Sequence, residues 1–436
     1  MTFSAESVMK RSIDVVLVSS VVLAIAAPFI WGVSLGGVLA IVGAVVLVNV
    51  LAWHRAQSRA IAPHVEGSVA LVRYPSVTVV RPVRGADVGA RENFTAALDT
   101  GYPGEVETLF VFDDEKDPGL PIAREVVKRH RALGRRGRAD VIVAGAPPAG
   151  RTGKLNAMSV GARMARGELI AFGDSDTRPD RNVLRRTVET LVITPGAGSA
   201  FAPILVHQPP RAAGDVLYAL MQNALYAPLA AWASGARREL PFIMGQLMVF
   251  KREALTAIGG VECADGQLVD DMYIGKRVHQ AGYKNVMSRA PLHIATGGMT
   301  LRQFLPVYRR WMAFSRNGLP LSFTWRQWLQ GGEFWIALIA ALIALASGRL
   351  VAAIFPSLAL IAMTVSLLAL QRGYGGAKIP LRWAWAPFGF YLLAPFVLLA
   401  NELKRRVVWR GRVYAVNGAA ALAVRPSAPP VRAHAA

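Results

Sequence analysis

The stretch ELIAFGDSDT, residues 168–177, is an apolar run that ends in two carboxylates. We predict a buried strand at residues 168–172, because a short apolar run bounded by a turn is typical of one. Asp174 and Asp176 would share a face of an extended segment. Both could then contact one hard cation, which prefers oxygen ligands and leaves positions open for phosphate oxygens. Surface turns are also rich in Asp and Ser, so the rest of the chain decides between a metal site and a turn.

Composition indicates a membrane-associated protein with an anionic partner. Of the 436 residues, 53% are hydrophobic and 18% are charged, which is too apolar for a wholly soluble protein. The formal net charge of +21 predicts binding to an anionic membrane surface or to phosphorylated ligands. Nucleic acid is not expected as a partner, because no zinc-ligand spacing, basic heptad or aromatic ribonucleoprotein motif accompanies this charge. Cys263 is the single cysteine, so an internal disulfide is excluded and a reducing compartment fits.

The N-terminal segment, residues 1–60, is predicted to form a transmembrane hairpin. Residues 15–53 contain no charged side chain, and as one helix they would span roughly 58 Å, against a hydrocarbon core of about 30 Å. Two spans joined by a bend at residues 28–37 therefore fit better than one. A cleaved signal peptide is the alternative, but a second apolar run follows the first at once. Arg11 and Arg55 at the two ends favour the cytoplasmic side for both.

Residues 70–299 are predicted to form one domain in which strands alternate with helices. This alternation predicts an α/β fold with a mostly parallel sheet covered on both faces. The predicted strands are residues 77–80, 106–112, 141–144, 168–172, 199–205 and 242–248, and the predicted helices are residues 122–133, 154–166 and 180–190. Ligands of such sheets bind at the carboxyl ends of the strands. Two pairs of carboxylates follow strand ends, Asp113 with Asp114 and Asp174 with Asp176, which favours a site over ordinary turns.

Residues 300–332 are predicted to form amphipathic helices at the membrane surface. One helical face carries Leu301, Phe304, Leu305, Tyr308 and Trp311, and the arginines Arg302, Arg309 and Arg316 lie elsewhere. An aromatic and aliphatic face beside a basic face is typical of a helix among lipid headgroups. A helix simply packed on the catalytic domain is the alternative.

A second transmembrane region of two to three spans is predicted at residues 333–402. Residues 334–371 fit two spans, and residues 383–401 form a third candidate with tryptophans near its start. Two prolines make that third segment a candidate re-entrant element instead. The basic residues that follow favour the cytoplasm, whereas three spans would place them outside. Residues 403–436 are predicted to be a basic cytoplasmic tail with a disordered end.

Further motifs flank the predicted strands and helices. They are Arg81-Pro82, FDDEKDP at residues 112–118, GKLN at 153–156, LVDDMY at 268–273 and Arg310-Trp311. Together with the two aspartates of residues 174–176, they resemble the membrane-bound family 2-type glycosyltransferases of the GT-A fold. Within that group the chain resembles the ceramide glucosyltransferases and the bacterial hopanoid-pathway glycosyltransferases. The resemblance covers roughly residues 76–316, and WRGRVY at 409–414 is also similar to these bacterial enzymes.

The resemblance implies a Rossmann-like, mixed and mostly parallel sheet flanked by transmembrane helices. It implies that Asp114, with Asp113 as second choice, holds the uridine base. Asp174 and Asp176 would bind a divalent metal, Mn²⁺ or Mg²⁺, and Asp271 would be the catalytic base. The other residues that it implies at the site are Asp270, Arg81, Pro82, Lys154, Asn156, Arg310 and Trp311. The family has Gln or Arg where this chain has Val307, and Arg309 is a candidate substitute.

The chemistry of these residue types fits glycosyl transfer. A divalent ion and nearby cationic side chains such as Lys154 and Arg310 would neutralise the diphosphate that leaves. Asp271 would take the proton of an acceptor hydroxyl as it attacks the anomeric carbon, which inverts the configuration. Asp270 beside it would raise the pKa of Asp271. The alternative for this pair is ordinary acidic decoration of a helix N-terminus.

The sequence therefore predicts an inverting glycosyltransferase of the bacterial inner membrane, with its catalytic domain in the cytoplasm. The donor would be a nucleotide diphospho-sugar, a UDP-sugar, and the acceptor a membrane lipid hydroxyl of ceramide or hopanoid type. A processive polysaccharide synthase, related to cellulose or hyaluronan synthases, is the first alternative. A non-catalytic membrane protein that binds nucleotide sugars is the second. The sequence does not specify the sugar or the oligomeric state.

Overall fold

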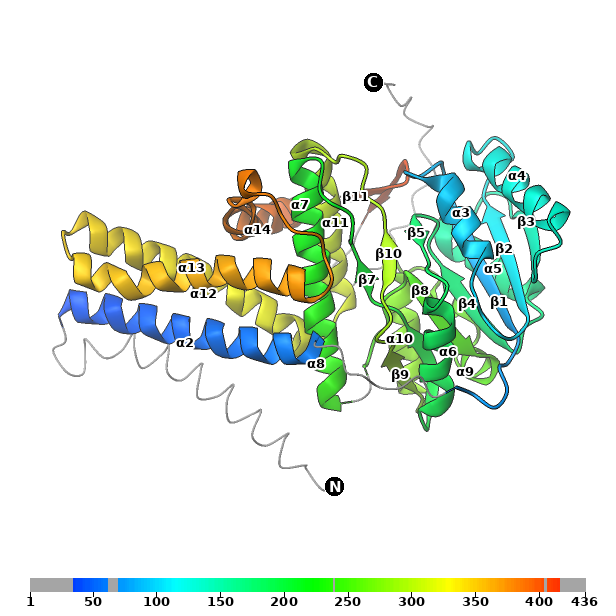
Figure 1. The fold of residues 1–436 in the computed structure, drawn as a ribbon, viewed down its shortest axis with the longest axis horizontal. Coiled ribbons are helices and arrows are strands. Elements are labelled where there is room, and N and C mark those ends of the chain that lie inside the picture. The colour runs from blue at the N-terminus through cyan, green and yellow to red at the C-terminus, as the bar shows by residue number, and fades with distance from the viewer. Residues whose placement is uncertain (1–33, 62–69, 238–239, 404–405, 416–436) are drawn as a thin grey trace.

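The computed structural model describes residues 34–61, 70–237, 240–403 and 406–415. Figure 1 shows two parts, an α/β domain with a central sheet and an elongated bundle of long helices. Helices α7 (Ala213–Leu220) and α11 (Leu301–Gly318) stand between them. The first span of the predicted N-terminal hairpin lies outside the described residues, and its second span is helix α2 (Leu35–Ile61).

The central sheet has seven strands in the order β3-β2-β1-β4-β8-β6-β9. Four neighbouring strands are parallel, namely β1 (Val77–Val83), β2 (Val106–Phe112), β3 (Arg138–Val143) and β4 (Leu169–Gly173). Strand β8 (Leu247–Lys251) runs antiparallel between β4 and β6 (Ala197–Phe201), and β9 (Lys284–Met287) is parallel to β6. The predicted mixed, mostly parallel sheet is confirmed.

Helices cover both faces of this sheet, as the alternation of strands and helices predicts. Side chains along β1 alternate, so Val79 packs into the core beneath α6 (Val183–Ile193), whereas Val80 packs against α5 (Gly153–Met164) on the other face. Helices α3 (Ala90–Leu98) and α4 (Gly119–Ala132) share an apolar core with the ends of β1 and β2. This packing fixes the carboxyl ends of the strands, where the predicted carboxylates lie.

A small second sheet, in the order β5-β10-β7, adjoins the strand ends. Its strands are β5 (Thr177–Arg178), β7 (Ile204–Leu205) and β10 (Leu292–Ile294). The prediction of one strand at residues 199–205 is wrong in this respect, because the chain leaves the main sheet after Phe201 and enters the second sheet at Ile204. Pro203 lies between and has no N–H to continue the ladder.

The strand predicted at residues 242–248 is also wrong over most of its length. The structure begins β8 only at Leu247, and Phe242 and Ile243 are buried in a loop. Met244 and Gln246 of this loop line a cavity described below, and Gly245 lies against Asp271. Hydrophobicity alone did not distinguish a buried loop from a buried strand.

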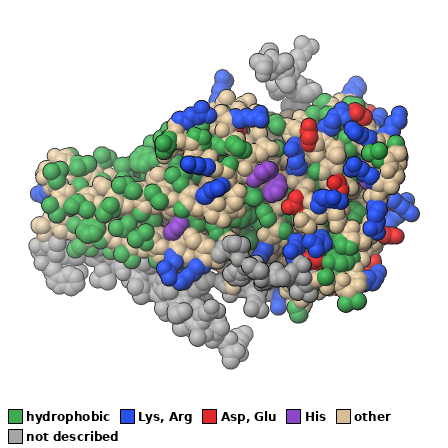
Figure 2. All heavy atoms as spheres, in the orientation of Figure 1, with side chains coloured by type: hydrophobic (Ala, Val, Ile, Leu, Met, Phe, Trp, Pro, Cys, Tyr) green, Lys and Arg blue, Asp and Glu red, His purple; other side chains and the backbone are tan. Residues whose placement is uncertain are grey.

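Four helices among the described residues are long and apolar enough to cross a membrane. They are α2, α12 (Leu321–Ala346), α13 (Leu350–Gly373) and the segment Leu381–Asn401, which includes most of α14 (Ala386–Leu403). Figure 2 shows hydrophobic side chains covering the bundle, whereas Lys and Arg gather on the rest of this face. Exposed apolar residues such as Leu51, Leu342 and Val351 suit contact with lipid.

Two elements join the bundle to the α/β domain. Helix α7 continues through a π-helical turn (Met221–Tyr226) into α8 (Ala227–Arg237), an arrangement that we did not predict from the sequence. The amphipathic helix predicted from residue 300 is α11, and its Phe304 and Tyr308 are buried against the protein. The basic segment predicted as a tail forms a hairpin of β11 (Arg406–Trp409) and β12 (Arg412–Ala415).

Candidate active site

A cavity of about 410 Å³ opens at the carboxyl ends of β1, β2 and β4. The register of the parallel strands pairs Val83 with Phe112, so the strands end side by side and the residues that follow them converge. Six carboxylates line the cavity, Asp87, Asp113, Asp174, Asp176, Asp270 and Asp271. Five cationic side chains line it as well, Arg84, Lys154, Arg310, Arg410 and Arg412. Charged groups from distant parts of the sequence thus meet in one place.

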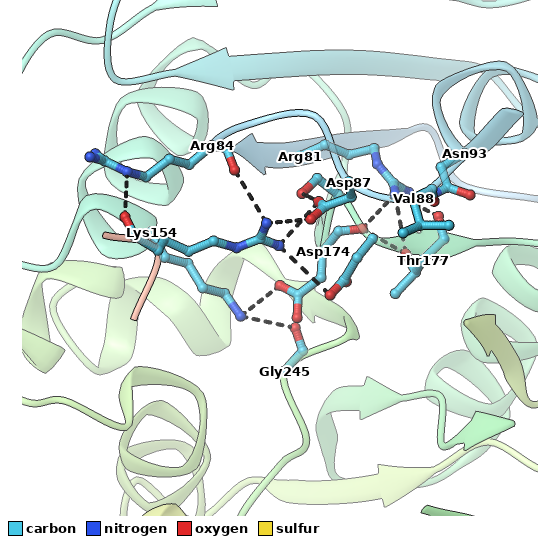
Figure 3. A network of polar contacts seen from close by, with 12 residues as sticks. Arg81, Arg84, Asp87, Val88, Asn93, Lys154, Asp174, Thr177 and Gly245 are labelled. Atoms are coloured by element: carbon cyan, nitrogen blue, oxygen red, sulfur yellow. Dashed lines mark hydrogen bonds and ion pairs between the residues drawn. The ribbon is translucent and has the colours of Figure 1, made fainter. Parts of the chain in front are cut away.

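Asp174 and Asp176 lie on the turn that connects β4 to β5, and Arg81 holds this turn in place. The buried Arg81 guanidinium donates hydrogen bonds to the Asp174 carbonyl and, at 3.0 and 3.1 Å, to the carbonyl and hydroxyl oxygens of Thr177. Burial lowers the pKa of Arg81 to about 10, although nearby carboxylates oppose this shift. Figure 3 shows Arg81 and Lys154 approaching the turn from opposite sides.

Lys154, in the first turn of α5, forms an ion pair with Asp174. Its amine lies 2.7 Å from Asp174 Oδ1 and donates to the Gly245 carbonyl at 3.4 Å. Burial alone would lower the pKa of Lys154, but Asp174, Asp270 and Asp271 raise it above the ordinary value. Lys154 therefore carries a positive charge at physiological pH and partly neutralises the acidic side of the cavity.

Asp270 and Asp271 begin helix α10 (Asp270–Gln280), where the helix dipole favours carboxylates. The Asp271 N–H donates to Asp270 Oδ1, and the Met272 N–H donates to Asp271 Oδ1, both at 2.8 Å. Burial raises the pKa of Asp270 to about 6 and also raises the pKa of Asp271, while Lys154 opposes both shifts. A Cβ on Gly245 would collide with the Asp271 carboxylate, so this approach requires glycine.

The surroundings of Asp176 suit the binding of a cation. Burial and the neighbouring Asp174 raise its pKa to about 6, and Arg410 opposes the shift. Its Oδ1 is buried without a hydrogen-bond partner. In the described part of the chain, no three His, Cys, Asp or Glu side chains are grouped to hold a metal by themselves. Two carboxylates with open positions are nevertheless what Mg²⁺-type sites use when substrate phosphates supply further ligands, so Asp174 and Asp176 fit such an ion.

The two aspartates after β2 point to different places. Asp113 is buried, lines the main cavity, and accepts ion pairs at 2.9 Å from both Arg84 and Arg412. Asp114 is exposed and lines an adjoining hollow of about 660 Å³, which Asp113, Arg84 and Arg412 also border. The structure thus places the second choice of the sequence analysis, Asp113, nearer the other charged groups.

Helix α11 supplies the wall of the cavity that faces the helical bundle. Arg310 and Trp311 both line the cavity, as does Val307 one turn earlier. Burial lowers the pKa of Arg310, although Tyr218 and the acidic residues oppose this. Arg309, the candidate substitute for the missing polar residue, does not line it; its guanidinium donates to Asn401 Oδ1 at 2.8 Å and to the Arg406 carbonyl at 2.9 Å. That suggestion is therefore not supported.

Two other candidate residues lie outside the cavity. Arg81 lies beneath the aspartate turn, as described above, whereas Pro82 next to it lines the cavity. Asn156 is buried and donates to the Gly145 carbonyl at 3.4 Å, which holds the loop before α5. Arg81 and Asn156 therefore hold neighbouring segments in place without lining the cavity.

Sequence analysis missed Asp87 and the C-terminal hairpin as parts of the site. Asp87 accepts from Ser175 Oγ at 2.8 Å and forms an ion pair with Arg410. For Arg410 and Arg412, the charge pattern of the sequence predicted only a location on the cytoplasmic side. The resemblance of residues 409–414 to bacterial relatives was the one signal that could have pointed to them.

Comparison with known proteins supports this picture of a sugar-transfer enzyme. Residues 37–421 match the family described as Glycosyl transferase family 21. Ceramide glucosyltransferase 1 of Caenorhabditis elegans is 23% identical over 258 residues, covering 56% of this chain and 51% of that protein. The ceramide glucosyltransferase of Gibberella zeae is 26% identical over 140 residues, covering 31% of this chain and 26% of that protein. The chain thus matches about half or less of the length of these curated relatives.

A solved structure shows the same fold. The mannosyltransferase PcManGT from Pyrobaculum calidifontis, in complex with GDP-Man and Mn²⁺, superposes with a TM-score of 0.51 at 19% sequence identity. The superposition covers 83% of this chain and 99% of that one. The predicted GT-A-type fold and the resemblance to ceramide glucosyltransferases are confirmed. Because the family match extends over most of the sequence, the chain belongs to Glycosyl transferase family 21.

Proposed function

We propose that this glycosyltransferase moves a sugar from a UDP-sugar to the hydroxyl group of a membrane lipid of ceramide or hopanoid type. One observation carries the proposal. Asp113, Asp174 and Asp271, which follow three different segments of the chain, line a single cavity whose far wall is the amphipathic helix α11. A sugar donor bound at the strand ends and a lipid acceptor that arrives on the α11 side could therefore meet in this cavity.

The donor is proposed to lie along the strand ends. Asp113, held by Arg84 and Arg412, is the proposed contact for the uracil base, with Asp114 bordering the adjoining hollow. Asp174 and Asp176 are proposed to hold Mn²⁺ or Mg²⁺. When bound there, such an ion supplies Lewis-acid stabilisation of the charge on the leaving diphosphate. Lys154 and Arg310 add positive charge from the α5 and α11 sides of the cavity.

Asp271 is the proposed catalytic base. It lines the cavity, and burial raises its pKa, which makes its carboxylate a better proton acceptor than an exposed aspartate. Attack by the acceptor hydroxyl from the side opposite the diphosphate inverts the anomeric configuration. An α-linked donor then gives a β-linked product. Gly245, whose missing side chain leaves room for the Asp271 carboxylate beside it, is proposed to set the position of the base.

The acceptor is proposed to arrive from the bilayer. Arg310 and Trp311 of α11 line the cavity, and the same helix packs against α7 and against α14, most of which belongs to one of the four candidate spans. A lipid in the bilayer could thus present its hydroxyl to Asp271 while its chains stay among the helices. The basic residues that flank the apolar segments favour the cytoplasmic face of a bacterial inner membrane, where nucleotide sugars are made.

The direct test is transfer from a panel of labelled nucleotide sugars by membranes that contain the protein, followed by lipid extraction. We expect label in the lipid fraction from a UDP-sugar, as a single added residue. A long polymer would replace this proposal with a processive polysaccharide synthase. Nucleotide-sugar binding without any transfer to lipid would leave only a binding protein.

A further inference from the structure

The C-terminal hairpin β11–β12 reaches the cavity from far along the sequence. Its two strands pair from Arg406 with Ala415 to Trp409 with Arg412, so the connecting turn consists of Arg410 and Gly411. Both turn residues have positive φ, 49° and 74°. Arg410 is the one non-glycine residue with a positive φ in the described part of the chain. A tight two-residue hairpin turn requires positive φ at both positions, so Arg410 takes a conformation that costs energy for a residue with a side chain.

Contacts on two sides hold the hairpin against helix α11 and against the end of β1. The Trp409 ring contacts Phe314 of α11 edge to face, with centroids 5.9 Å apart, and Arg309 binds the Arg406 carbonyl. On the opposite side, the Arg84 Nε donates to the Arg410 carbonyl at 2.9 Å. These contacts tie the turn to both α11 and the end of β1, so the position of Arg410 is defined by the protein around it.

Two of the three arginines of the hairpin, Arg410 and Arg412, bind carboxylates of the site. Arg410 pairs with Asp87, with one contact at 3.1 Å, and its Nη2 lies 3.7 Å from Asp176 Oδ2. Arg412 pairs with Asp113 at 2.9 Å. A Cβ on Gly153 would collide with both Arg412 and Asp113, so glycine at the start of α5 leaves room for this pair.

The charges around the cavity show why the hairpin matters for an anionic ligand. Among the described residues that line the cavity, six carboxylates face five cationic side chains, and the hairpin supplies two of the five. Without the hairpin, three cations would face six carboxylates, and a diphosphate would meet net repulsion. A divalent ion offsets only two of those charges.

We propose that Arg410 is a ligand of the donor diphosphate, presented by the hairpin, and that Arg412 positions Asp113 for the nucleoside. This inference rests on the proposed function. Arg410 stands beside Asp176, the carboxylate that is proposed to bind the metal ion. With a divalent ion held by Asp174 and Asp176, Arg410 would leave Asp176 and direct its N–H groups to the phosphate oxygens. Guanidinium groups suit this task because their paired N–H groups match phosphate geometry.

The test measures binding of UDP and of UMP to the full-length protein by calorimetry, at one fixed Mn²⁺ concentration. UMP lacks the outer phosphate, so the difference between the two ligands isolates the contact that Arg410 is proposed to make. We expect Arg410→Gln to weaken UDP binding by about 10-fold to 100-fold and UMP binding by less than about 3-fold. Arg410→Lys, which keeps the charge but loses the paired geometry, should fall between wild type and Arg410→Gln. Arg412→Gln should weaken UDP and UMP by similar factors.

Arg406→Gln is the matched control, because Arg406 lies exposed on the same hairpin and does not line the cavity. It should bind both ligands as the wild type does, and thermal unfolding of each variant checks that the fold is retained. Unchanged or tighter UDP binding by Arg410→Gln would overturn the inference, because Arg410 would then merely occupy the place of the metal ion. If the wild type itself binds neither UDP nor UMP, the proposed function fails and the inference falls with it.

Discussion

The two sides of the cavity are built by different means. On the sheet side, the turn with Asp174 follows a buried strand, and the buried Arg81 guanidinium fixes the turn from below. On the hairpin side, Arg410 sits on a two-stranded ribbon whose strands are four residues each and whose Val408 and Val413 are exposed. The first side is part of the folded core, and the second lies on its surface. We infer that the sheet side sets the chemistry and the hairpin side completes the donor site.

Removal of the metal ligands should have the largest effect. Asp174→Ala or Asp176→Ala should lower transfer by about 100-fold or more, because the diphosphate then leaves without the charge stabilisation that a divalent ion supplies. Chelation of the wild type should have the same effect, and added Mn²⁺ or Mg²⁺ should restore it. Transfer that persists with a chelator would remove the role given to both aspartates.

The second largest effect should be a difference in the free energy of unfolding between variants on the two sides of the cavity. Arg81→Met should lower the free energy of unfolding by about 2–4 kcal/mol, because it leaves buried oxygens of the aspartate turn without their donor. Arg412→Gln removes a hairpin arginine whose side chain is 28% exposed, and Asp113 keeps Arg84 as a partner, so the free energy of unfolding should fall by only about 1 kcal/mol. Denaturant unfolding in detergent measures both. Equal destabilisation would contradict the distinction between a core side and a surface side.

The pH dependence of sugar transfer should follow the ionisation of Asp271, the proposed base on the sheet side. Only the ionised Asp271 carboxylate accepts a proton, so kcat/KM should fall as the pH decreases through its pKa. Burial raises this pKa and also raises that of the neighbouring Asp270 to about 6, so the acid limb should lie above the usual aspartate range.

Lys154 provides the matching variant. Its positive charge lowers the pKa of both aspartates, so Lys154→Met should move the acid limb to higher pH. Lys128→Met, on the exposed surface of α4, should leave the limb where it is. A limb that stays in place in Lys154→Met would show that this aspartate pair does not control the profile.

The sequence predicted the sheet side well because its signals are local. Strand β2 has the predicted bounds, residues 106–112, and the carboxylates that follow the strands do converge. Whether Asp113 or Asp114 faces the cavity depends on the path of a single turn, which hydrophobic pattern does not determine. Likewise, only packing shows that Arg81 and Asn156 are behind the site, since both are polar residues next to strand or helix ends.

The role of the hairpin was not predicted, because it depends on contacts between residues that are far apart in the sequence. Nothing in the pattern of residues 406–415 links Arg410 to Asp176, which lies more than 200 positions earlier, and the basic charge there was explained by topology alone. Similarly, the π-helical turn at residues 221–226 packs against α13 and β7, and the local sequence pattern does not specify these contacts. Long-range contacts of this kind require the folded structure.

The most direct test of the central claim compares wild type and Asp271→Asn for both UDP–Mn²⁺ binding and sugar transfer, in the same preparation. If one cavity holds the donor and the base in separate roles, the variant binds UDP within about 3-fold of wild type and loses transfer by about 100-fold or more. Full activity in Asp271→Asn would contradict the account, and so would loss of binding together with transfer.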